Sequence, residues 1–551
     1  MHRNKRQATI IYIFFAIFIA MFLILPLGRL FVNSLRGNQG SILENYTSIL
    51  KDKDIITAIC NSIKISLLTA VITTSLAFIL AYGVNCTGIS KNVKRIIHMG
   101  TLIPMLLPTI TYGFAIIYSF GKQGLLTKLF GREIIKIYGF NGLLIGYIIY
   151  TLPMTFLLIN NSFGYIDKKF IVVSKLMKDN FFRGFLNTII RPLIGTIGGA
   201  FLLSFVLSFT DFGIPASVGG TYKVISTRLY QVMLGSIPDF NKGSVIAVIM
   251  LVPAIIGVVL LKYLDRFDFH YDKITKAQLI KNKRRDVTFT GFSILVVLSI
   301  LSVFLVMFIT PFVENYPYDM KFTTKYFTKT LLSHAVLNVY KNSLIVSGAT
   351  ALLGTLITYG SAIINTRTGL KKRLKSTIDF VAIVTNSIPG MVLGLAYLFL
   401  FNKSDFKGTF VIIIFCNVIH FYTTPYLMAK NALSKMNPAW EVTGELMGDT
   451  WFKTIVRVII PNSITTIIEM ISYFFINSMI TISAIIFLVT AKTSLLTSKI
   501  KELQHYANFN EVFILSILIF LTNIVFKILS KIFEDKYLTS QLELYKTKKG
   551  V

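Results

Sequence analysis

Twelve separate runs of about 20 mostly apolar residues occur along the chain, and no other feature constrains its fold as much. A run of this length is what an α-helix needs to cross the hydrocarbon core of a bilayer. We therefore predict an all-α polytopic membrane protein with twelve transmembrane helices. The predicted spans are Ala8–Gly28, Ile63–Val84, Ile97–Phe120, Gly139–Ile159, Pro192–Phe209, Ser244–Leu261, Thr288–Phe312, Ser343–Ile364, Phe380–Phe401, Thr409–Met428, Pro461–Leu488 and Val512–Ile528.

The composition agrees with a membrane protein and argues against soluble classes. Of 551 residues, 54% are hydrophobic and only 15% are charged, whereas soluble proteins carry about 25% charged residues. The net charge is +31, because 56 Lys and Arg face 25 Asp and Glu. A nucleic-acid-binding protein would not also be this apolar. We therefore predict no nucleic-acid partner. The three cysteines and six histidines are scattered without metal-ligand spacing, so we also predict no metal site and no bound cofactor.

Clusters of basic residues predict the orientation in the membrane. Cytoplasmic loops of membrane proteins are enriched in Lys and Arg. With twelve spans, the basic N-terminus, the middle loop and the loop after the eighth span fall on one side, together with the C-terminal tail. We predict that both termini are cytoplasmic and that the protein crosses the plasma membrane many times. The clusters hold Arg3, Lys5, Arg6, then Arg266, Lys273, Lys276, Lys281, Lys283, Arg284, Arg285, then Arg367, Lys371, Lys372, Arg373 and Lys375.

An internal repeat divides the sequence into halves. Residues 61–88 align with residues 342–369 without gaps at an offset of 281, and two prolines and two glycines continue this register. Both halves hold six predicted spans, so the repeat is parallel, as in transporters with two related halves. We predict two modules, 1–274 and 275–551, and kinks at the matched prolines. The residues matched at this offset include Asn61/Asn342, Ser62/Ser343, Pro108/Pro389 and Gly113/Gly394, and Pro153 and Pro425 correspond at a different offset, 272.

Each half has a longer polar segment between its fourth and fifth spans, on the predicted cytoplasmic side. The two segments read Leu176-Met177-Lys178-Asp179-Asn180-Phe181-Phe182-Arg183 and Leu446-Met447-Gly448-Asp449-Thr450-Trp451-Phe452-Lys453. Aromatic side chains on a cytoplasmic helix indicate docking to a partner. The alternative is an interfacial helix that anchors its aromatic side chains among lipid headgroups.

The second segment resembles a known family. Glu441-Val442-Thr443-Gly444-Glu445-Leu446-Met447-Gly448, followed by Ile459-Ile460-Pro461, is similar to the EAA loop of permease subunits of ATP-binding-cassette importers. By position, Glu441 or its neighbour, Gly448 and Pro461 match the family pattern, and Thr443 and Gly444 take its small-residue places. The first copy departs from it, because Val172, Val173 and Ser174 replace Glu-Ala-Ala and Lys178 replaces the glycine. The loops lie near residues 171–192 and 441–461.

The resemblance implies two fused permease modules with the type I importer fold. In this family the loop forms a coupling helix that binds a cytoplasmic ATPase. The chain lacks a G-x-x-x-x-G-K-[ST] motif, so we predict that it is not an enzyme and that ATP and Mg are used by two copies of a separate ATPase. A substrate-binding protein is expected outside. The predicted coupling residues are Leu176, Met177, Asp179, Phe181, Phe182, Glu441, Thr443, Gly444, Gly448, Asp449, Trp451, Phe452 and Pro461.

Two stretches after the fifth and eleventh spans bear on the substrate. Residues 211–220 and 481–488 look most like permeases for 2-aminoethylphosphonate, so we predict this or a similar small phosphonate. Permeases for ferric iron are the next most similar, followed by those for thiamine and polyamines. A secondary transporter with twelve spans is the alternative class, because it also has two parallel halves.

Polar residues within or beside the spans are candidates for the pathway. A charge in mid-membrane costs about 2.5–3.5 kcal/mol, so it usually faces a bundle interior or a water-filled cavity. We predict that Glu469 lines the pathway and that Asp211, with Gly213, Pro215 and Ser483 nearby in their loops, shapes the outer gate. The alternative is a neutral, hydrogen-bonded Glu469 and a solvated Asp211.

Overall fold

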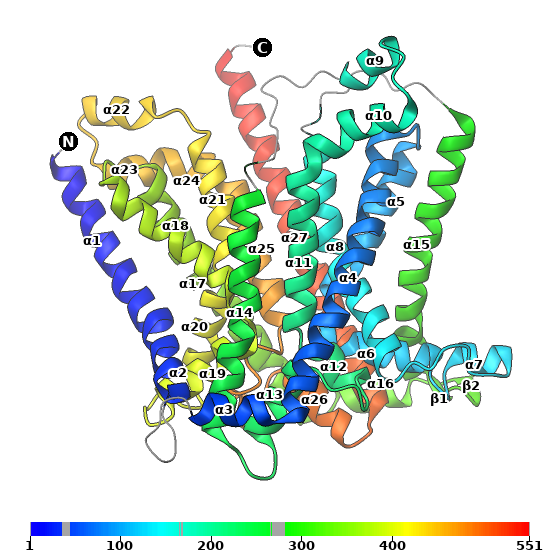
Figure 1. The fold of residues 1–551 in the computed structure, drawn as a ribbon. Coiled ribbons are helices and arrows are strands. Elements are labelled where there is room, and N and C mark those ends of the chain that lie inside the picture. Colours follow the sequence, from blue (N-terminus) through cyan, green and yellow to red (C-terminus); the bar gives the residue numbers. More distant parts are fainter. Residues whose placement is uncertain are drawn as a thin grey trace. The chain divides into compact units, whose positions relative to one another are not determined.

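The computed structural model describes residues 2–35, 44–164, 166, 169–264, 266 and 282–549 (Figure 1). It divides into two compact units. Unit 1 comprises Met1–Arg36, Thr330–Glu502 and Ile517–Val551, and unit 2 comprises Gly37–Lys329 and Leu503–Ser516. Each unit therefore contains a long helix from the opposite half of the sequence. The predicted division at 274/275 separates the two copies of the sequence repeat, whereas the compact units are defined by contacts and have other boundaries. The predicted modules therefore stay a prediction.

Eight of the twelve predicted runs lie on single helices that are long and apolar enough to cross a membrane. These are Gln7–Leu35, Lys53–Cys86, Phe140–Phe163, Phe182–Thr210, Phe240–Leu264, Lys283–Phe312, His334–Thr366 and Phe509–Thr539. Three of the other four runs lie on helix pairs bent by 107°, 105° and 55°. The fourth, Pro461–Leu488, starts on a pair bent by 77°, but the helix ends at Ile480 and residues 481–488 are not helical, so the predicted span is too long there. The described residues thus contain eight candidate spans, or up to twelve if each bent pair is one span.

Unit 2 is built around the long helix α4, which packs against α8 and α11. Its only strands among the described residues form an antiparallel hairpin of β1 and β2. The elements of unit 2 are α3 (Glu44–Lys51), α4 (Lys53–Cys86), α5 (Lys91–Leu102), η2 (Ile103–Leu106), α6 (Thr109–Phe120), α7 (Leu125–Phe130), α8 (Phe140–Phe163), α9 (Lys169–Leu176), α10 (Phe181–Phe185), η3 (Leu186–Ile190), η4 (Arg191–Leu193), α11 (Ile194–Thr210), α12 (Gly213–Val218), α13 (Ile225–Leu234), α14 (Phe240–Leu264), α15 (Lys283–Ile309), η6 (Thr310–Phe312), β1 (Val313–Asn315), β2 (Asp319–Phe322) and most of α16 (Lys325–Leu331).

Unit 1 repeats this plan around α17, which packs against α20, α21 and α25. Helices α26 and α27 belong to unit 1 except for residues 503–516. The elements of unit 1 are α1 (His2–Ile19), η1 (Ala20–Ile24), α2 (Leu25–Leu35), α17 (His334–Thr366), α18 (Lys372–Ser387), α19 (Gly390–Phe401), α20 (Phe410–His420), α21 (Thr423–Ser434), α22 (Ala439–Leu446), α23 (Trp451–Thr454), η7 (Ile455–Ile459), α24 (Ile460–Asn462), α25 (Ile464–Ile480), α26 (Leu496–His505) and α27 (Phe509–Lys549).

The first long helix of the chain packs on unit 1 through aromatic side chains. Phe22 stacks on Phe415 of α20 with ring centroids 4.3 Å apart, and the Tyr397 hydroxyl donates to the Phe22 carbonyl oxygen at 2.6 Å. This carbonyl lies in the π-helical turn η1, where the regular hydrogen-bond pattern is interrupted and a backbone acceptor is open to a side chain. Packing, not proximity in sequence, therefore assigns this helix to unit 1.

Prolines at equivalent positions break the third and ninth predicted spans. Pro108 and Pro389 directly precede α6 and α19, and the residues before them, Leu107 and Ile388, are extended. A proline disfavours helical backbone at the preceding residue and supplies no N–H, which accounts for a break at this point. The bends of 107° and 105° show that the break is the same in both modules.

Small and hydroxyl-bearing residues fill the helix interfaces, as is common between membrane helices. In unit 2, the Thr151 hydroxyl of α8 donates to Thr73 of α4 at 3.1 Å and accepts from Ser204 of α11 at 3.0 Å. In unit 1, a Cβ on Gly354 of α17 would lie 2.7 Å from the Phe474 ring of α25. Close approach of these helices explains why the repeat preserves small residues.

Candidate functional site

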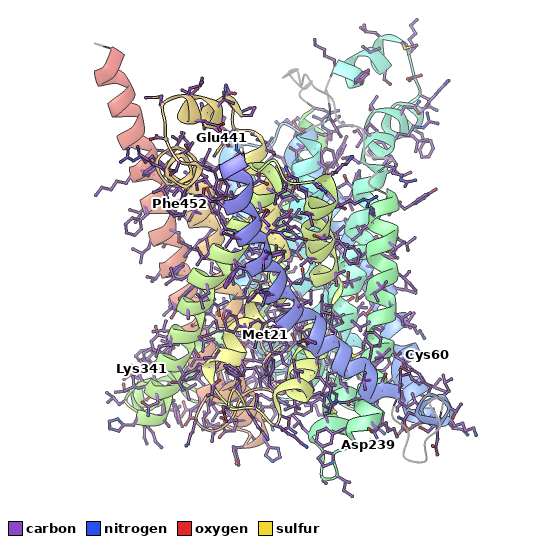
Figure 2. The ribbon with its side chains drawn as sticks, turned by 90° about the vertical axis from the view of Figure 1, so that its left-hand side faces the viewer. Met21, Cys60, Asp239, Lys341, Glu441 and Phe452 are labelled. Atoms are coloured by element: carbon purple, nitrogen blue, oxygen red, sulfur yellow. The ribbon has the colours of Figure 1, made fainter. Side chains whose placement is uncertain are left out.

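The second predicted coupling loop consists of α22, a turn and α23, and it displays apolar side chains. None of the residues of α22 is buried. Leu446, Met447 and Phe452 are 83%, 78% and 62% exposed. Figure 2 shows Glu441 and Phe452 at one end of unit 1, with Lys341 of α17 toward the opposite end. Large exposed apolar side chains grouped on one short segment are typical of a surface that binds a partner.

The first loop, α9 to α10 in unit 2, displays the same side chains at the same places. Leu176, Met177 and Phe182 are 77%, 73% and 70% exposed. The side chain of Phe181 lies outside what the structure describes. The two loops therefore share an exposed apolar tip, although only the second resembles the EAA pattern.

Backbone geometry shows that the turns of the two loops are equivalent, at an offset of 270 residues. Lys178 and Gly448 both have positive φ, at 55° and 79°, directly before an aspartate. Asp179 and Asp449 each donate a backbone N–H to the carbonyl oxygen five residues earlier, at 3.1 and 2.9 Å. Lys178 thus occupies the turn position at which the second loop has glycine.

A second correspondence exchanges glycine and hydroxyl residues between the loops. In the second loop, a Cβ on Gly444 would lie 2.6 Å from the Thr454 hydroxyl. In the first loop, a Cβ on Gly184 would lie 2.7 Å from the Ser174 hydroxyl. At the offset that relates Lys178 to Gly448, Ser174 is equivalent to Gly444, and Gly184 is equivalent to Thr454. Each loop thus has one glycine facing one hydroxyl residue. The glycine comes first in the second loop and last in the first loop. Close packing between the two short helices is kept in both.

Other predicted loop residues have mainly structural contacts. The two aromatic residues of the second loop, Trp451 and Phe452, were both expected to face outward. Trp451 is only 6% exposed, so this expectation is wrong for Trp451. The Thr443 hydroxyl donates to the Ala439 carbonyl oxygen at 2.9 Å, and the Pro461 carbonyl oxygen accepts from the Tyr537 hydroxyl at 2.8 Å. The aspartates Asp179 and Asp449 pair with the basic residue four positions later, Arg183 and Lys453.

Sequence reasoning missed the partner of Glu441. Arg367, at the end of α17, donates to both carboxylate oxygens of Glu441, at 2.5 and 2.6 Å. A signal was present in the repeat, because the residues at the two equivalent positions of the first module are Cys86 and Ile171. Both members of the ion pair are absent together there. The exposed pair Leu446 and Met447 was also missed, although Leu176 and Met177 were predicted.

The opposite end of unit 2 shows what the repeated Asn-Ser pair does in the first module. The Asn61 side chain donates to the Lys223 carbonyl oxygen at 3.0 Å, and the Ser62 hydroxyl accepts from the Ile225 N–H at 2.8 Å. These bonds attach the start of α4 to the loop between α12 and α13.

The second module makes the same attachment. Asn342 donates to the Ser494 carbonyl oxygen at 3.2 Å, and the Ser343 hydroxyl accepts from the Leu496 N–H at 2.8 Å. The repeated residues therefore hold the segment after the fifth or eleventh predicted span. Along α17, Asn342 and Arg367 are 25 residues apart, about 37 Å at 1.5 Å per residue, so this attachment and the coupling loop lie at opposite ends.

Asp211 follows α11 and caps the short helix α12. Its carboxylate accepts from the Ile214 N–H at 2.9 Å, and its carbonyl oxygen accepts from the Ser226 hydroxyl at 2.7 Å. The residue is buried, so the alternative of a solvated Asp211 is wrong. Burial raises the pKa of this carboxyl to about 6, although hydrogen bonds from Ile214 and Thr109 act against the rise. The gate role stays a prediction.

The remaining gate candidates lie where the same loops press on α6 and α19. A Cβ on Gly213 would lie 2.1 Å from the Thr109 hydroxyl and 2.5 Å from the Ile110 nitrogen. In the second module the Ser483 hydroxyl lies 2.6 Å from where a Cβ on Gly390 would be. Pro215 is buried within α12. These positions are constrained by packing, and a part in transport stays a prediction.

Glu469 lies on α25 and is exposed at the surface of that helix. Its predicted role in lining the pathway stays a prediction.

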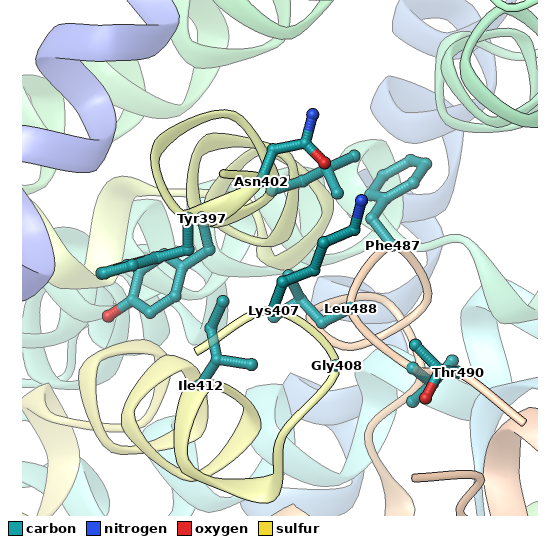
Figure 3. A pocket seen from close by; sticks show the side chains of 11 residues that line it. Tyr397, Asn402, Lys407, Gly408, Ile412, Phe487, Leu488 and Thr490 are labelled. Carbon is teal, nitrogen blue, oxygen red and sulfur yellow. The ribbon is translucent and has the colours of Figure 1, made fainter. Parts of the chain in front are cut away.

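A small cavity in unit 1, about 50 Å³, lies between α19, α20 and residues 487–490 (Figure 3). This volume holds a few water molecules at most. Among the described residues, no group of three or more His, Cys, Asp or Glu could hold a metal ion.

Comparison with known proteins identifies relatives along both modules. A ferric transport system permease protein FbpB of Actinobacillus pleuropneumoniae is 25% identical over 88% of this chain and 72% of its own length. A protein named putative ferric transport system permease protein FbpB 1, from Haemophilus influenzae, is 25% identical over 86% of this chain and 77% of its own length. A probable sulfate transport system permease protein of Helicosporidium is 29% identical over 45% of this chain and 90% of its own length.

A family model covers most of both modules. The model for the binding-protein-dependent transport system inner membrane component matches residues 73–267 and again residues 354–539. The two matches confirm two fused permease modules and exclude the alternative class of a secondary transporter. They also place the chain among multi-pass membrane proteins that work with an ATPase and a substrate-binding protein. The chain thus belongs to the family of inner membrane permease components of binding-protein-dependent importers.

Proposed function

We propose that this permease imports ferric iron. The observation that supports this substrate is that two relatives described as ferric transport permeases align along both modules, over 88% and 86% of this chain. The probable sulfate permease aligns with less than half of it, 45%. The prediction of 2-aminoethylphosphonate has no support among these relatives, whereas ferric iron was its first alternative.

Two equivalent loops are the proposed contacts with the ATPase. Each presents an exposed leucine, methionine and phenylalanine on a short helical hairpin. We expect one ATPase subunit at each loop, so two copies per permease, with ATP and Mg bound by those subunits. The loop end carries the basic residues 367–375, which favours a cytoplasmic position for this end and for both termini. Closure of the ATPase pair would then draw the loops together.

Uptake of radioactive iron tests the substrate. Cells that lack this permease are compared with cells that regain it, with ferric iron, 2-aminoethylphosphonate, thiamine, spermidine and sulfate as labelled substrates in separate assays. Restored uptake of ferric iron alone is the expected result. Restored uptake of another compound without ferric iron would overturn the substrate. Uptake that persists when the ATPase carries an inactivated nucleotide-binding lysine would overturn the coupling to ATP.

A further inference from the structure

Arg367 makes several hydrogen bonds to the second coupling loop and to the segment before it. Its Nε and Nη2 atoms donate to the two carboxylate oxygens of Glu441, at 2.5 and 2.6 Å. Its Nη1 atom donates to the carbonyl oxygens of Met436 and Leu433, at 2.9 and 3.5 Å, and Nη2 also donates to Asn437 at 3.1 Å. All five N–H groups of the guanidinium are thus used. The side chain ties the end of α17 to the last turn of α21 and to the first turn of α22.

The ion pair is shielded, which makes it a firm link. The Arg367 side chain is 5% exposed and Glu441 is 20% exposed. A planar guanidinium that meets a carboxylate with two hydrogen bonds fixes the orientation of both groups. None of the residues of α22 is buried, and this pair ties the first turn of that helix directly to the end of α17.

A second ion pair extends the link across the same end of unit 1. The Lys430 ammonium of α21 lies 2.5 Å from Asp379 of α18, and the Tyr426 hydroxyl donates to the same carboxylate at 2.7 Å. The Asn365 amide of α17 donates to the Tyr426 hydroxyl at 2.8 Å. These bonds join helices α17, α18 and α21 beside the Arg367 pair. A displacement of α22 would therefore act on three linked helices and not on α17 alone.

The first module cannot form the equivalent pair. In the gapless register of residues 61–88 and 342–369, Arg367 corresponds to Cys86. In the loop register set by Lys178 and Gly448, Glu441 corresponds to Ile171. Neither a thiol nor an alkyl side chain can replace a bidentate ion pair. The exposed tips of the two loops are alike, but only the second has this link.

We propose that the Arg367–Glu441 pair carries displacement of the second coupling loop into α17, and that the two loops are mechanically inequivalent because the first lacks the pair. Glu441 and Arg367 are positioning residues: both carboxylate oxygens of Glu441 are occupied within the chain, so it acts through Arg367. The mechanical role rests on the proposed docking of the loops to the ATPase. The difference in rigidity does not, and it is measured without any ATPase.

Spin labels on the two loop tips test the rigidity in the full-length protein in lipid nanodiscs. Leu446→Cys and Leu176→Cys are labelled separately after Cys60→Ser, because Cys60 is the exposed one of the three cysteines. We expect a less mobile spectrum at 446 than at 176. Glu441→Gln should raise mobility at 446 and leave 176 unchanged. Asp449→Asn is the matched control, since it removes the loop's own pair with Lys453 and should leave both spectra unchanged.

Equal mobility at the two tips would overturn the asymmetry, and an unchanged spectrum at 446 in Glu441→Gln would overturn the link. Arg367→Lys, which keeps the charge without the planar fork, should raise mobility at 446 in the same way.

Coupling is then measured on the complete transporter with the ATPase that copurifies with the wild-type chain. Glu441→Gln and Arg367→Lys should lower transport per ATP hydrolysed by about fivefold or more, with ATPase binding retained. Combining the two changes should cost no more than either alone. Unchanged transport per ATP in both variants would overturn the mechanical role. If no ATPase copurifies, the proposed function fails, while the spin-label result still decides the link.

Discussion

Lys178 and Gly448 adopt the same left-handed backbone conformation, with φ of 55° and 79°, at equivalent turns of the two loops. Such a conformation costs a residue with a Cβ about 1–2 kcal/mol, whereas glycine adopts it freely. No described atom lies within 4 Å of the place where a Cβ on Gly448 would be, so backbone conformation alone favours glycine there. The first loop therefore carries local strain that the second loop avoids.

Lys178→Gly is expected to stabilise the first loop. Removal of the left-handed strain should lower the population of opened loop by about fivefold, which corresponds to about 1 kcal/mol. Chymotrypsin cleavage after the exposed Leu176 or Phe182 reports this opening, so the cleavage rate of the folded protein should fall. The reverse change, Gly448→Lys, should speed cleavage after Leu446. Slower cleavage in both variants would contradict the strain, and it could not be ascribed to charge, because one change removes a positive charge and the other adds one.

The glycine–hydroxyl exchange predicts a compensating pair of substitutions in the second loop. Gly444→Ala places a methyl group 2.6 Å from the Thr454 hydroxyl, and all three nearest atoms belong to that one side chain. The single variant should open or lose the contact between α22 and α23. Thr454→Ala removes the obstructing atoms, so the double variant should recover most of the loss.

A double-mutant cycle measures this compensation. We expect a coupling energy of about 0.5–3 kcal/mol from thermal unfolding and from proteolysis of the loop. Gly348→Ala in α17 is the control, because no described atom lies within 4 Å of its new methyl group. Additive effects of Gly444→Ala and Thr454→Ala would mean that the two residues do not contact each other.

Apolar run length predicted where the helices lie, because a membrane span must be long and apolar whatever its neighbours are. Proline positions predicted the bends less well. Pro108 and Pro389 stand at sharp breaks, yet Pro153 lies within the continuous helix α8. Pro425 stands in the first turn of α21, where its missing N–H would have no helical partner. The effect of a proline depends on whether neighbouring groups replace the lost hydrogen bond.

The tips of the coupling loops could be located from sequence, because their exposed apolar residues stand in a polar segment. The Arg367–Glu441 pair was missed, because 74 residues separate its members and their joint absence from the first module does not by itself show that they are in contact. A solvated Asp211 was the alternative to a gate role, and the turn into α12 buries the residue instead, where its carboxylate accepts from the Ile214 N–H. The substrate could not be derived from these residues, since the outer loops are shaped by packing against α6 and α19.

Equal effects are expected from removing the two equivalent serines. Ser62→Ala and Ser343→Ala each delete a buried acceptor, and each leaves an N–H, of Ile225 or Leu496, without its 2.8 Å bond. Each variant should lose about 1–3 kcal/mol of stability in thermal unfolding. Ser75→Ala is the control, because this exposed hydroxyl donates only to Val71 in its own helix at 2.8 Å. A loss confined to one module would contradict the equivalence of the two attachments.

Asp211 should make stability depend on pH. Burial raises its pKa from the ordinary 3.8 to about 6 in the folded protein. A raised pKa means that the protonated form is favoured on folding, so this contribution is complete below pH 4 and is lost as the pH rises through 6. Asp211→Asn keeps an acceptor for the Ile214 N–H and cannot ionise. The variant should therefore gain stability over wild type between pH 4 and pH 7, measured by thermal unfolding.

Asp52 provides a control of opposite sign, outside the spans. It caps α4, and the hydrogen bond from Lys242, 2.6 Å from its carboxylate, lowers its pKa below the ordinary 3.8. Its contribution is present above its unfolded pKa and is lost as the pH falls through the folded value. Asp52→Asn should thus lose stability relative to wild type at neutral pH, and the difference should close in acid. If both variants shift with pH in the same direction, general charge repulsion and not burial governs the response, and Asp211 is not held in the protonated form by its surroundings.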